Sequence, residues 1–380
     1  MTKVMTVVGT RPEIIRLSEV IKRLDVTVDH VLVHTGQNYD YELNEIFFEE
    51  LGLRKPDHFL EVDTSSLGRV LGEVLIKTEQ VLLAEKPDAF LVLGDTNSCV
   101  AALMAKRMRV PVYHMEAGNR CFDENVPEET NRRLIDHVAD FNLVYTEHAR
   151  RNLLAEGIQP RRILLTGSPM NEVLSAQRKA IDTSDVLERL GLEEGGYFLV
   201  SAHREENVDN PIRLSALLDC LETVVEEFKL PVLVSTHPRT RKRLEESGRS
   251  VGGVTFHKPL GFHDFNHLQL KARCVLSDSG TIAEESSLLG FPAVTLRDSI
   301  ERPEALDTGA IVMTGLEPAN VLEAVRLKMA GATIGRGPAL PQDYRPVNTS
   351  ERAVSFILST WRRHAAWSGL QSRQLAGDTA

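Results

Sequence analysis

Short apolar segments alternate along the chain with longer segments in which apolar residues recur at helical spacing. In the first half, the apolar segments predict strands at 3–10, 30–36, 89–96, 112–117, 142–146 and 163–168. The helical spacing predicts helices at 12–24, 42–51, 67–85, 97–108, 129–138 and 147–155. The strand segments show no alternation of apolar and polar residues, which is typical of parallel strands covered on both faces. The pattern therefore predicts a doubly wound parallel sheet.

The same alternation begins again after the polar segment 181–196. Further strands are predicted at 197–203, 231–237, 254–260, 274–280, 292–297 and 310–315. Because 380 residues is about twice the usual domain size, we expect two domains. We predict an α/β protein with two Rossmann-like, doubly wound domains at 1–180 and 181–348, a cleft between them, and one further helix at 349–369.

Composition narrows the possible partners of the chain. It is 42% hydrophobic and 26% charged, and its net charge is −10, so we expect neither nucleic acid nor an anionic membrane as a partner. No apolar segment approaches the ~18 residues of a membrane span. The four cysteines are scattered without a C-x-x-C pair. This favours a cytoplasmic protein without a zinc site, and we expect no metal and no cofactor.

Polar side chains follow many of the predicted strands. Arg11 follows the first strand, Asp95 follows the segment 89–93, and His203 and His237 end two strands of the second half. In open parallel sheets, ligands bind at the carboxyl ends of the strands. We therefore predict that Arg11 binds a substrate and that His203 exchanges protons, with His237 as a weaker candidate of the same kind. Asp95 is equally well explained as a helix N-cap.

The segment "LSDSGTIAEESSLLG" at 276–290 contains a strand, a turn and the start of a helix. Backbone N–H groups of the turn and the helix dipole favour an anion, so Ser279, Gly280 and Thr281 are candidates for binding a phosphate. An ordinary N-cap explains the turn about as well. Glu285 suits the hydroxyls of a ribose, as acids do in dinucleotide sites. The segment thus indicates the ribose-diphosphate end of a nucleotide sugar.

The segment "HMEAGNRCFDENVPEETNRR" at 114–133 carries several carboxylates directly after a predicted strand. Glu116 follows that strand, whereas Glu128 and Glu129 begin the next predicted helix. Acids are common at helix starts, and this alone can explain Glu129. Asp95, Glu116 and Glu128 are expected to converge at one edge of the sheet. Clustered carboxylates raise one another's pKa, which suits them to acid–base catalysis near neutral pH.

Seven short motifs follow one another along the chain: GTRPE (9–13), GDT (94–96), EAG (116–118), PEE.NR (127–132), AHREEN (202–207), DSGTIAEE (278–285) and RPEA (302–305). In this order they resemble the non-hydrolysing UDP-N-acetylglucosamine 2-epimerases over roughly residues 1–360. The resemblance implies a fold of the glycosyltransferase-B type, whose C-terminal helix crosses back to the first domain. It also implies that the segment 349–369 is this helix.

The resemblance further implies a reaction without NAD: inversion at C2 of a UDP-2-acetamido sugar. Anti elimination of UDP gives a 2-acetamidoglucal, to which UDP adds back after reprotonation on the other face. By motif position, the family's catalytic carboxylates and active-site histidine correspond to Asp95, Glu116, Glu128 and His203. The residues that hold the substrate correspond to Arg11, Arg16, His237, Ser279, Gly280, Thr281, Glu285 and Arg302. We also expect a homodimer.

The chain departs from the family pattern at three places. Arg16 stands where many members carry a lysine, and the loop between EAG and PEE is shorter than in bacterial members with a "Q-H-R" element. In those members the element binds a second, activating substrate molecule, whereas Asn38 and Tyr39 follow Gln37 here. We therefore expect no activating site and a hyperbolic dependence of rate on substrate concentration.

Two other functions compete with an epimerase. A glycosyltransferase shares the fold and the UDP site, but it usually needs fewer carboxylates near C2 of the donor. A regulator that binds the nucleotide sugar without catalysis has no need of Asp95, Glu116, Glu128 and His203. Among epimerases, conversion of UDP-N-acetylglucosamine to UDP-N-acetylmannosamine is the default. The sequences of segments 35–42, 116–129 and 201–209 also resemble the branch that forms UDP-N-acetyl-L-fucosamine.

Overall fold

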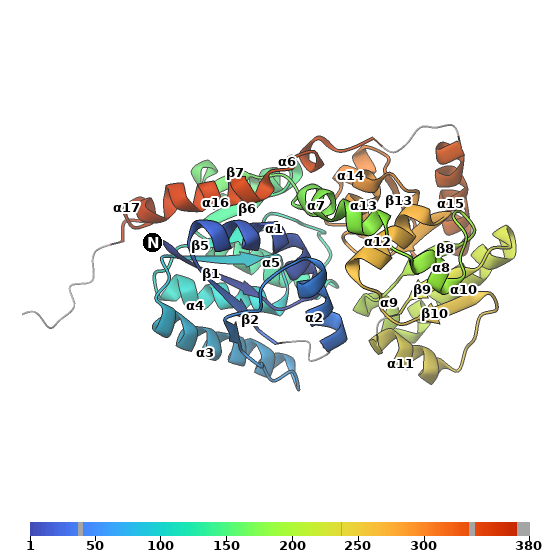
Figure 1. The fold of residues 1–380 in the computed structure, drawn as a ribbon, viewed down its shortest axis with the longest axis horizontal. Coiled ribbons are helices and arrows are strands. Elements are labelled where there is room, and N and C mark those ends of the chain that lie inside the picture. Colours follow the sequence, from blue (N-terminus) through green and yellow to red (C-terminus); the bar gives the residue numbers. More distant parts are fainter. Residues whose placement is uncertain (37–40, 237, 334–338, 371–380) are drawn as a thin grey trace, which may run out of the picture.

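The computed structural model describes residues 1–36, 41–236, 238–333 and 339–370. Across these residues the strands form two all-parallel sheets, one of seven strands and one of six, and Figure 1 shows them as two α/β units. The first sheet has the order β3-β2-β1-β4-β5-β6-β7. Its strands are β1 (Lys3–Val8), β2 (Asp29–His34), β3 (His58–Phe59), β4 (Ala89–Leu93), β5 (Val112–Met115), β6 (Phe141–Val144) and β7 (Ile163–Leu165).

The second sheet has the order β10-β9-β8-β11-β12-β13. Its strands are β8 (Phe198–Ser201), β9 (Val232–Ser235), β10 (Val254–His257), β11 (Cys274–Ser277), β12 (Ala293–Thr295) and β13 (Ile311–Met313). The predicted fold class, two Rossmann-like domains of the glycosyltransferase-B type, is confirmed. The predicted domain boundaries stay predictions, and a single helix, Met170–Asp182, runs across residue 180.

Helices cover both faces of each sheet, which explains why the strands are apolar throughout. In the first sheet, the side chains of β4 belong alternately to a cluster under α1 and to one under α3 and α4. The helices are α1 (Arg11–Thr27), α2 (Tyr41–Glu50), α3 (Leu67–Glu85), α4 (Ala101–Arg107), α5 (Pro127–Val138), α6 (Glu147–Ala155), α7 (Met170–Asp182), α8 (Val186–Leu190), α9 (Glu205–Val208), α10 (Pro211–Phe228), α11 (Pro238–Ser247), α12 (Phe262–Lys271), α13 (Ile282–Leu289), α14 (Glu304–Asp307), α15 (Pro318–Thr333), α16 (Thr349–Thr360) and α17 (His364–Trp367).

The C-terminal helix α16 lies against the first domain, beside α1 (Figure 1). Ala353, Val354 and Ile357 enter the apolar core on that face of the first sheet, and the Tyr113 hydroxyl lies 2.7 Å from Thr360 Oγ1. The prediction of one helix over 349–369 was wrong in one respect. The segment is interrupted after Thr360 by a 3₁₀ turn at Trp361–Arg363, and α17 follows it.

Strand order reverses between β1 and β4 in the first sheet and between β8 and β11 in the second. Parallel sheets of this kind bind ligands where the order reverses. Arg11 and Asp95 follow β1 and β4, whereas His203 and Ser279 follow β8 and β11. None of the helices in the described part of the chain is long and apolar enough to cross a membrane.

Candidate functional site

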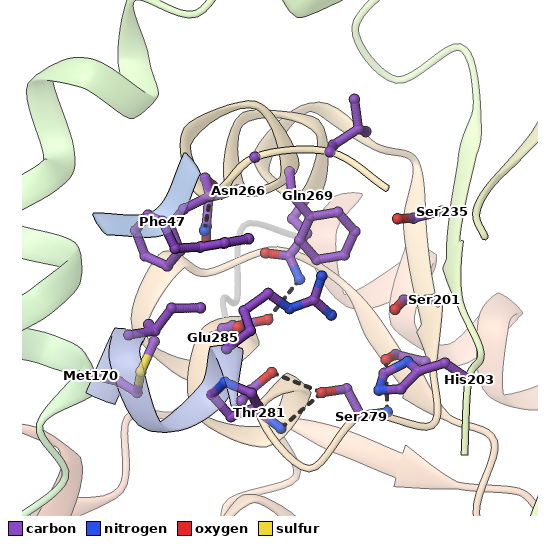
Figure 2. Close-up of a pocket in the computed structure, with 18 of the residues that line it drawn as sticks. Phe47, Met170, Ser201, His203, Ser235, Asn266, Gln269, Ser279, Thr281 and Glu285 are labelled. Carbon is purple, nitrogen blue, oxygen red and sulfur yellow. Dashed lines mark hydrogen bonds between the residues drawn. The ribbon is translucent and has the colours of Figure 1, made fainter. Parts of the chain in front are cut away.

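A pocket lies between the two domains, beside the ends of β8 and β11 and the start of α1 (Figure 2). Helix α12 supplies an apolar and amide wall, and α2 contributes Phe47. The residues that line it include Arg11, Arg16, Phe47, Ser201, His203, Ser235, Phe265, Asn266, Gln269, Ser279, Thr281 and Glu285. Polar groups therefore gather on the α13 side of the pocket and rings on the α2 and α12 side, as a nucleotide requires.

The turn before α13 forms the floor of this pocket. Ser279 Oγ lies 2.9 Å from Thr281 Oγ1 and accepts a hydrogen bond from the Thr281 N–H at 3.3 Å. Helix α13 begins at Ile282, so its positive end points toward the same place. Glu285 lies one turn into the helix, where it accepts a hydrogen bond from Gln269 Nε2 at 2.7 Å. Burial raises the pKa of Glu285 despite this hydrogen bond.

Arg11 and His203 lie on the two domains and line the same pocket. The guanidinium of Arg11 lies over the ring of Phe47, 5.5 Å from its centre. Burial lowers the pKa of Arg11, and the charge of Glu285 opposes this shift. The backbone N–H of His203 donates to the Asp278 carboxylate at 3.0 and 3.1 Å, while its ring stays 34% exposed. Asp278 thus fixes the loop that presents this ring.

Glu116 follows β5 in a left-handed conformation, with φ of 65°. This conformation is uncommon for a residue with a side chain, and it turns the chain sharply at the strand end. Arg16 Nη1 lies 3.1 Å from Glu116 Oε2, and Arg302 forms a second ion pair with Oε1. Burial raises the pKa of Glu116, the two arginines oppose this, and the charge of Asp95 adds to the increase.

Asp95 and Glu128 lie at the same edge of the first sheet, close enough for the charge of Asp95 to act on Glu128. Arg132 holds Asp95 with two nitrogens, Nη2 at 2.6 Å and Nε at 3.0 Å from Oδ2. Burial raises the pKa of Glu128, with Arg204 opposing and Asp95 adding to the shift. Because Asp95 acts on both Glu116 and Glu128, the three predicted carboxylates share one electrostatic environment.

Four charged side chains, each at most 10% exposed, alternate in sign where the two domains meet, and we call them the charge square: Arg16, Glu116, Arg302 and Glu284. Arg16 pairs with Glu116 and Glu284, and Arg302 pairs with the same two acids. Glu284 is completely buried and also accepts a hydrogen bond from Ser168. Burial alone would raise the pKa of Glu284, but Arg16 and Arg302 outweigh it and the pKa is lowered.

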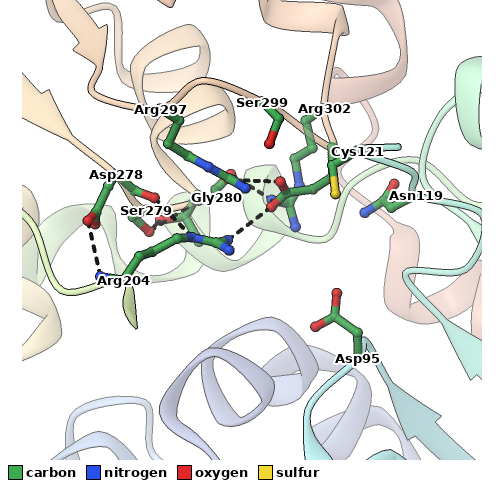
Figure 3. Close-up of polar contacts among 12 residues, drawn as sticks. Asp95, Asn119, Cys121, Arg204, Asp278, Ser279, Gly280, Arg297, Ser299 and Arg302 are labelled. Carbon is green, nitrogen blue, oxygen red and sulfur yellow. Dashed lines mark hydrogen bonds and ion pairs between the residues drawn. The ribbon is translucent and has the colours of Figure 1, made fainter. Parts of the chain in front are cut away.

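Figure 3 shows Arg204, Arg297 and Arg302 with their guanidinium groups directed toward one another. Glu301 lies among them, with Arg297 Nη1 at 2.5 Å and Arg204 Nη2 at 3.3 Å. Despite burial, these arginines hold the pKa of Glu301 well below its usual range. Arg302 Nη1 also donates to the Gly280 carbonyl at 2.6 Å, which fastens this cluster to the turn before α13.

Comparison with known proteins places this architecture in one family. The family model for UDP-N-acetylglucosamine 2-epimerase matches residues 22–358. The chain belongs to this family. The solved UDP-N-acetylglucosamine 2-epimerase from Rickettsia bellii is 44% identical to this epimerase, with a TM-score of 0.91 and coverage of 98% of this chain and 100% of that one.

Two further relatives show the breadth of the family. A structure of the Methanocaldococcus jannaschii enzyme in complex with UDP-GlcNAc and UDP is 36% identical, with a TM-score of 0.89 over 94% of this chain and 100% of that one. A UDP-2,3-diacetamido-2,3-dideoxy-D-glucuronate 2-epimerase from Pseudomonas aeruginosa is 37% identical over 87% of this chain and 93% of its own length. Members that are equally similar to this epimerase therefore carry different substrates in their names.

The epimerase gathers the predicted site residues around its interdomain contact. Arg11, Arg16, His203, Ser279, Thr281 and Glu285 line the pocket. Glu116 and Arg302 lie in the charge square, and Gly280 packs against it: a Cβ on Gly280 would meet Arg302 Nη1 at 2.6 Å. His237 lies outside the described residues, as do Asn38 and Tyr39, so the expectation of no activating site stays a prediction.

Several polar residues of the epimerase site escaped the sequence prediction. Glu129, interpreted there as a helix-dipole acid, is 1% exposed and accepts from Arg132 Nη1 at 2.8 Å and from the Cys121 N–H at 3.2 Å. It therefore supports the arginine that holds Asp95. No signal short of the fold identifies Glu284 as a partner of Arg16, since 268 positions separate them. Among the residues that the structure describes, no cluster of His, Cys, Asp and Glu is suited to a metal ion.

Proposed function

We propose that this epimerase interconverts UDP-N-acetylglucosamine and UDP-N-acetylmannosamine by inverting C2. The observation that carries the proposal is the meeting of Asp95, Glu116 and Glu128 beside the interdomain pocket and the turn before α13. Inversion needs a group that removes the C2 proton and one that returns it on the other face. Carboxylates whose pKa is raised by partial burial, such as Glu116 and Glu128, suit both tasks.

The UDP part is assigned to the pocket floor and its rim. In this proposal, the turn Ser279–Thr281 and the start of α13 bind the diphosphate, and Arg11 and His203 approach it from either side. In the same proposal, Glu285 accepts hydrogen bonds from the ribose hydroxyls, as acids do in dinucleotide sites. The sugar then extends toward Glu116, where Arg16 and Arg302 lie near the leaving diphosphate.

The reaction proceeds in two balanced halves. A carboxylate takes the proton from C2, the electrons of that bond form the C1–C2 double bond, and the C1–oxygen bond breaks toward UDP. The released 2-acetamidoglucal then accepts a proton at C2 on the opposite face, and the UDP oxygen bonds again to C1. Electrons and atoms return to their starting count, so neither NAD nor another redox cofactor enters the balance. Asp95, Glu116, Glu128 and His203 are the proposed acid–base groups, and their order of action is left open.

Substrate identity is tested by comparing nucleotide sugars directly. The Pseudomonas relative at 37% identity is named for UDP-2,3-diacetamido-2,3-dideoxy-D-glucuronate. This nucleotide sugar and the 2-epimer of UDP-N-acetyl-L-fucosamine are therefore tested in the same assay. Each is incubated with the enzyme alone in deuterated water and followed by NMR. The proposal expects deuterium at C2 and formation of the C2 epimer, fastest with UDP-N-acetylglucosamine. An unchanged UDP-N-acetylglucosamine would refute it, and transfer to an added acceptor would support the glycosyltransferase alternative.

We also propose a homodimer located in the cytoplasm. Ile76 and Leu83 lie two turns apart on α3 and are 57% and 59% exposed, which gives this helix an apolar surface suited to a second copy. The cysteines are four buried free thiols, which is typical of a reducing compartment. Light scattering would show twice the mass of 42.3 kDa for the dimer, and a single chain mass would refute that part.

A further inference from the structure

The charge square divides into two electrically neutral halves along the domain boundary. Arg16 on α1 and Glu116 after β5 belong to the first domain and pair at 3.1 Å. Glu284 on α13 and Arg302 before α14 belong to the second and pair at 3.3 Å. The two remaining pairs, Arg16 with Glu284 and Arg302 with Glu116, join the domains.

This division lets the domains separate at a tolerable energetic cost. An isolated buried charge costs several kcal/mol, but each half of the square keeps one cation and one anion together. When the domains meet, each acid gains a second arginine and loses water. Glu284 also gains a hydrogen bond from Ser168, which follows β7 of the first domain. The surroundings of Glu116 are therefore complete only when the domains are in contact.

We propose that Glu284 is a positioning residue, which holds Arg16 and Arg302 around Glu116 and offsets their charge so that Glu116 can exchange a proton. The inference rests on the proposed function, because it assigns Glu116 to proton transfer. Glu284 itself lies behind the arginines and is completely buried. It acts on the reacting carboxylate only through its two partners and its charge.

The charges that surround Glu116 set the sign of the effect. Burial raises the pKa of Glu116, Arg16 and Arg302 oppose this, and Asp95 and Glu284 add to the increase. The titratable and charged groups that face Glu116 are Arg16, Arg302, Asp95, Glu284 and the phenol of Tyr145. Without the charge of Glu284, two arginines would act on Glu116 against Asp95 alone. The pKa of Glu116 then moves down, whether the group serves as acid or as base.

The decisive measurement is the pH dependence of kcat for Glu284→Gln, using the C2-exchange assay on the full chain. We expect kcat to fall about tenfold to hundredfold near neutral pH, since a misplaced catalytic group commonly costs this much. We also expect one limb of the pH profile to move to lower pH. If Glu116 acts as a base the acid limb moves, and if it acts as an acid the alkaline limb moves.

Glu50→Gln is the matched control. Glu50 Oε2 on α2 accepts from the Phe262 N–H on α12 at 2.5 Å, so it is also a carboxylate that bridges the domains. It does not face Glu116, and its variant should leave the position of both limbs unchanged. A second variant, Glu284→Asp, keeps the charge but shortens the reach to Arg16. It should lower kcat about threefold to tenfold with both limbs in place.

The outcomes separate the two proposals. If the wild type does not exchange the C2 proton, the proposed function fails and this inference fails with it. If the wild type is active but Glu284→Gln leaves both limbs in place, or Glu50→Gln moves them equally, only the inference on Glu284 is overturned. Should Glu284→Gln not fold, wild-type kcat in Glu284→Asp overturns it in the same way.

Discussion

Two carboxylates from each domain reach the same contact, and their pKa values shift in opposite directions. In the first domain, burial raises the pKa of Glu116 and Glu128. In the second, arginines overcome burial and lower the pKa of Glu284 and Glu301. Glu284 and Glu116 even share Arg16 and Arg302. Burial is thus common to both groups, and the balance of neighbouring charges decides their protonation.

This difference indicates a division of labour between the domains. Acids with a raised pKa can give and take protons near neutral pH, whereas acids with a lowered pKa remain charged and hold cations in place. Asp95 near Glu116 and Glu128 adds negative charge to the first group. Arg204, Arg297 and Arg302 around Glu301 add positive charge to the second. In this proposal the first domain supplies the carboxylates that transfer protons, His203 joins them from the second domain, and Glu284 and Glu301 hold the arginines in place.

The largest effect should follow from removing the proposed acid–base groups of the first domain. Asp95→Asn, Glu116→Gln and Glu128→Gln should each lower kcat by roughly 10²–10⁴-fold while the protein stays folded. His203→Asn in the second domain should do the same. Turnover is followed by NMR and folding by circular dichroism. Glu124→Gln is the control, because this exposed acid lies in the turn just before α5, the helix that carries Glu128. Wild-type turnover in any of the four variants removes that residue from the mechanism.

Loss of a second-domain acid should instead affect stability. Glu301→Gln leaves Arg204, Arg297 and Arg302 without their shared anion, and the free energy of unfolding should fall by about 3–5 kcal/mol. Urea unfolding measures the change. Asp298→Asn is the control: its side chain is 60% exposed and pairs with Arg213, so it should cost less than about 1 kcal/mol. Equal losses in both variants would contradict the comparison.

The pH dependence of stability should distinguish the same two groups. The pKa of Glu301 is lower in the folded state than the value of about 4.3 for an unfolded glutamate. As the pH falls from the unfolded pKa toward the lower folded pKa, the unfolded chain binds the proton first. The stabilisation that Glu301 contributes at higher pH is therefore lost. The free energy of unfolding of the wild type should therefore drop on acidification, and Glu301→Gln should drop less. Parallel curves would show that Glu301 does not contribute.

The smallest of these effects concerns the turn before α13. A Cβ on Gly280 would lie 2.5 Å from Glu301 Oε1 and 2.6 Å from Arg302 Nη1. Gly280→Ala should push Arg302 away from the turn and lower kcat/KM about tenfold. Gly72→Ala on α3 is the control, since nothing lies within 4 Å of its Cβ position. An active Gly280→Ala enzyme would show that this cluster tolerates a shift.

Much of this fold was predictable because strands and helices leave a pattern of apolar residues within a short segment of the sequence. Apolar segments without alternation identified β4 and β5, and the predicted helix at 67–85 coincides with α3. The two-residue strand His58–Phe59 was missed, since so short an edge strand carries no period. The seven motifs led to the family without any knowledge of the fold.

The interactions that tune the site were not predictable in the same way. The motif positions of Arg16 and Arg302 predict substrate-binding residues, whereas nothing in the sequence identifies Glu284 as their shared partner. Its role depends on a pairing across 268 positions and on complete burial. Glu13 belongs to the motif GTRPE and had no predicted role, yet it is 1% exposed and accepts hydrogen bonds from the Gly9 and Thr10 N–H groups. Patterns of residue type do not encode such distant partners.

The return of α16 to the first domain has a consequence for biosynthesis. The seven strands of the first sheet end at Leu165, but Ala353, Val354 and Ile357 of its core arrive only with α16. During translation, the first domain therefore emerges with an apolar surface beside α1 that nothing yet covers. The second domain can fold while this surface is still uncovered. The N-terminal half of the enzyme is thus among the last parts to be completed, and chaperones have a defined surface to protect until then.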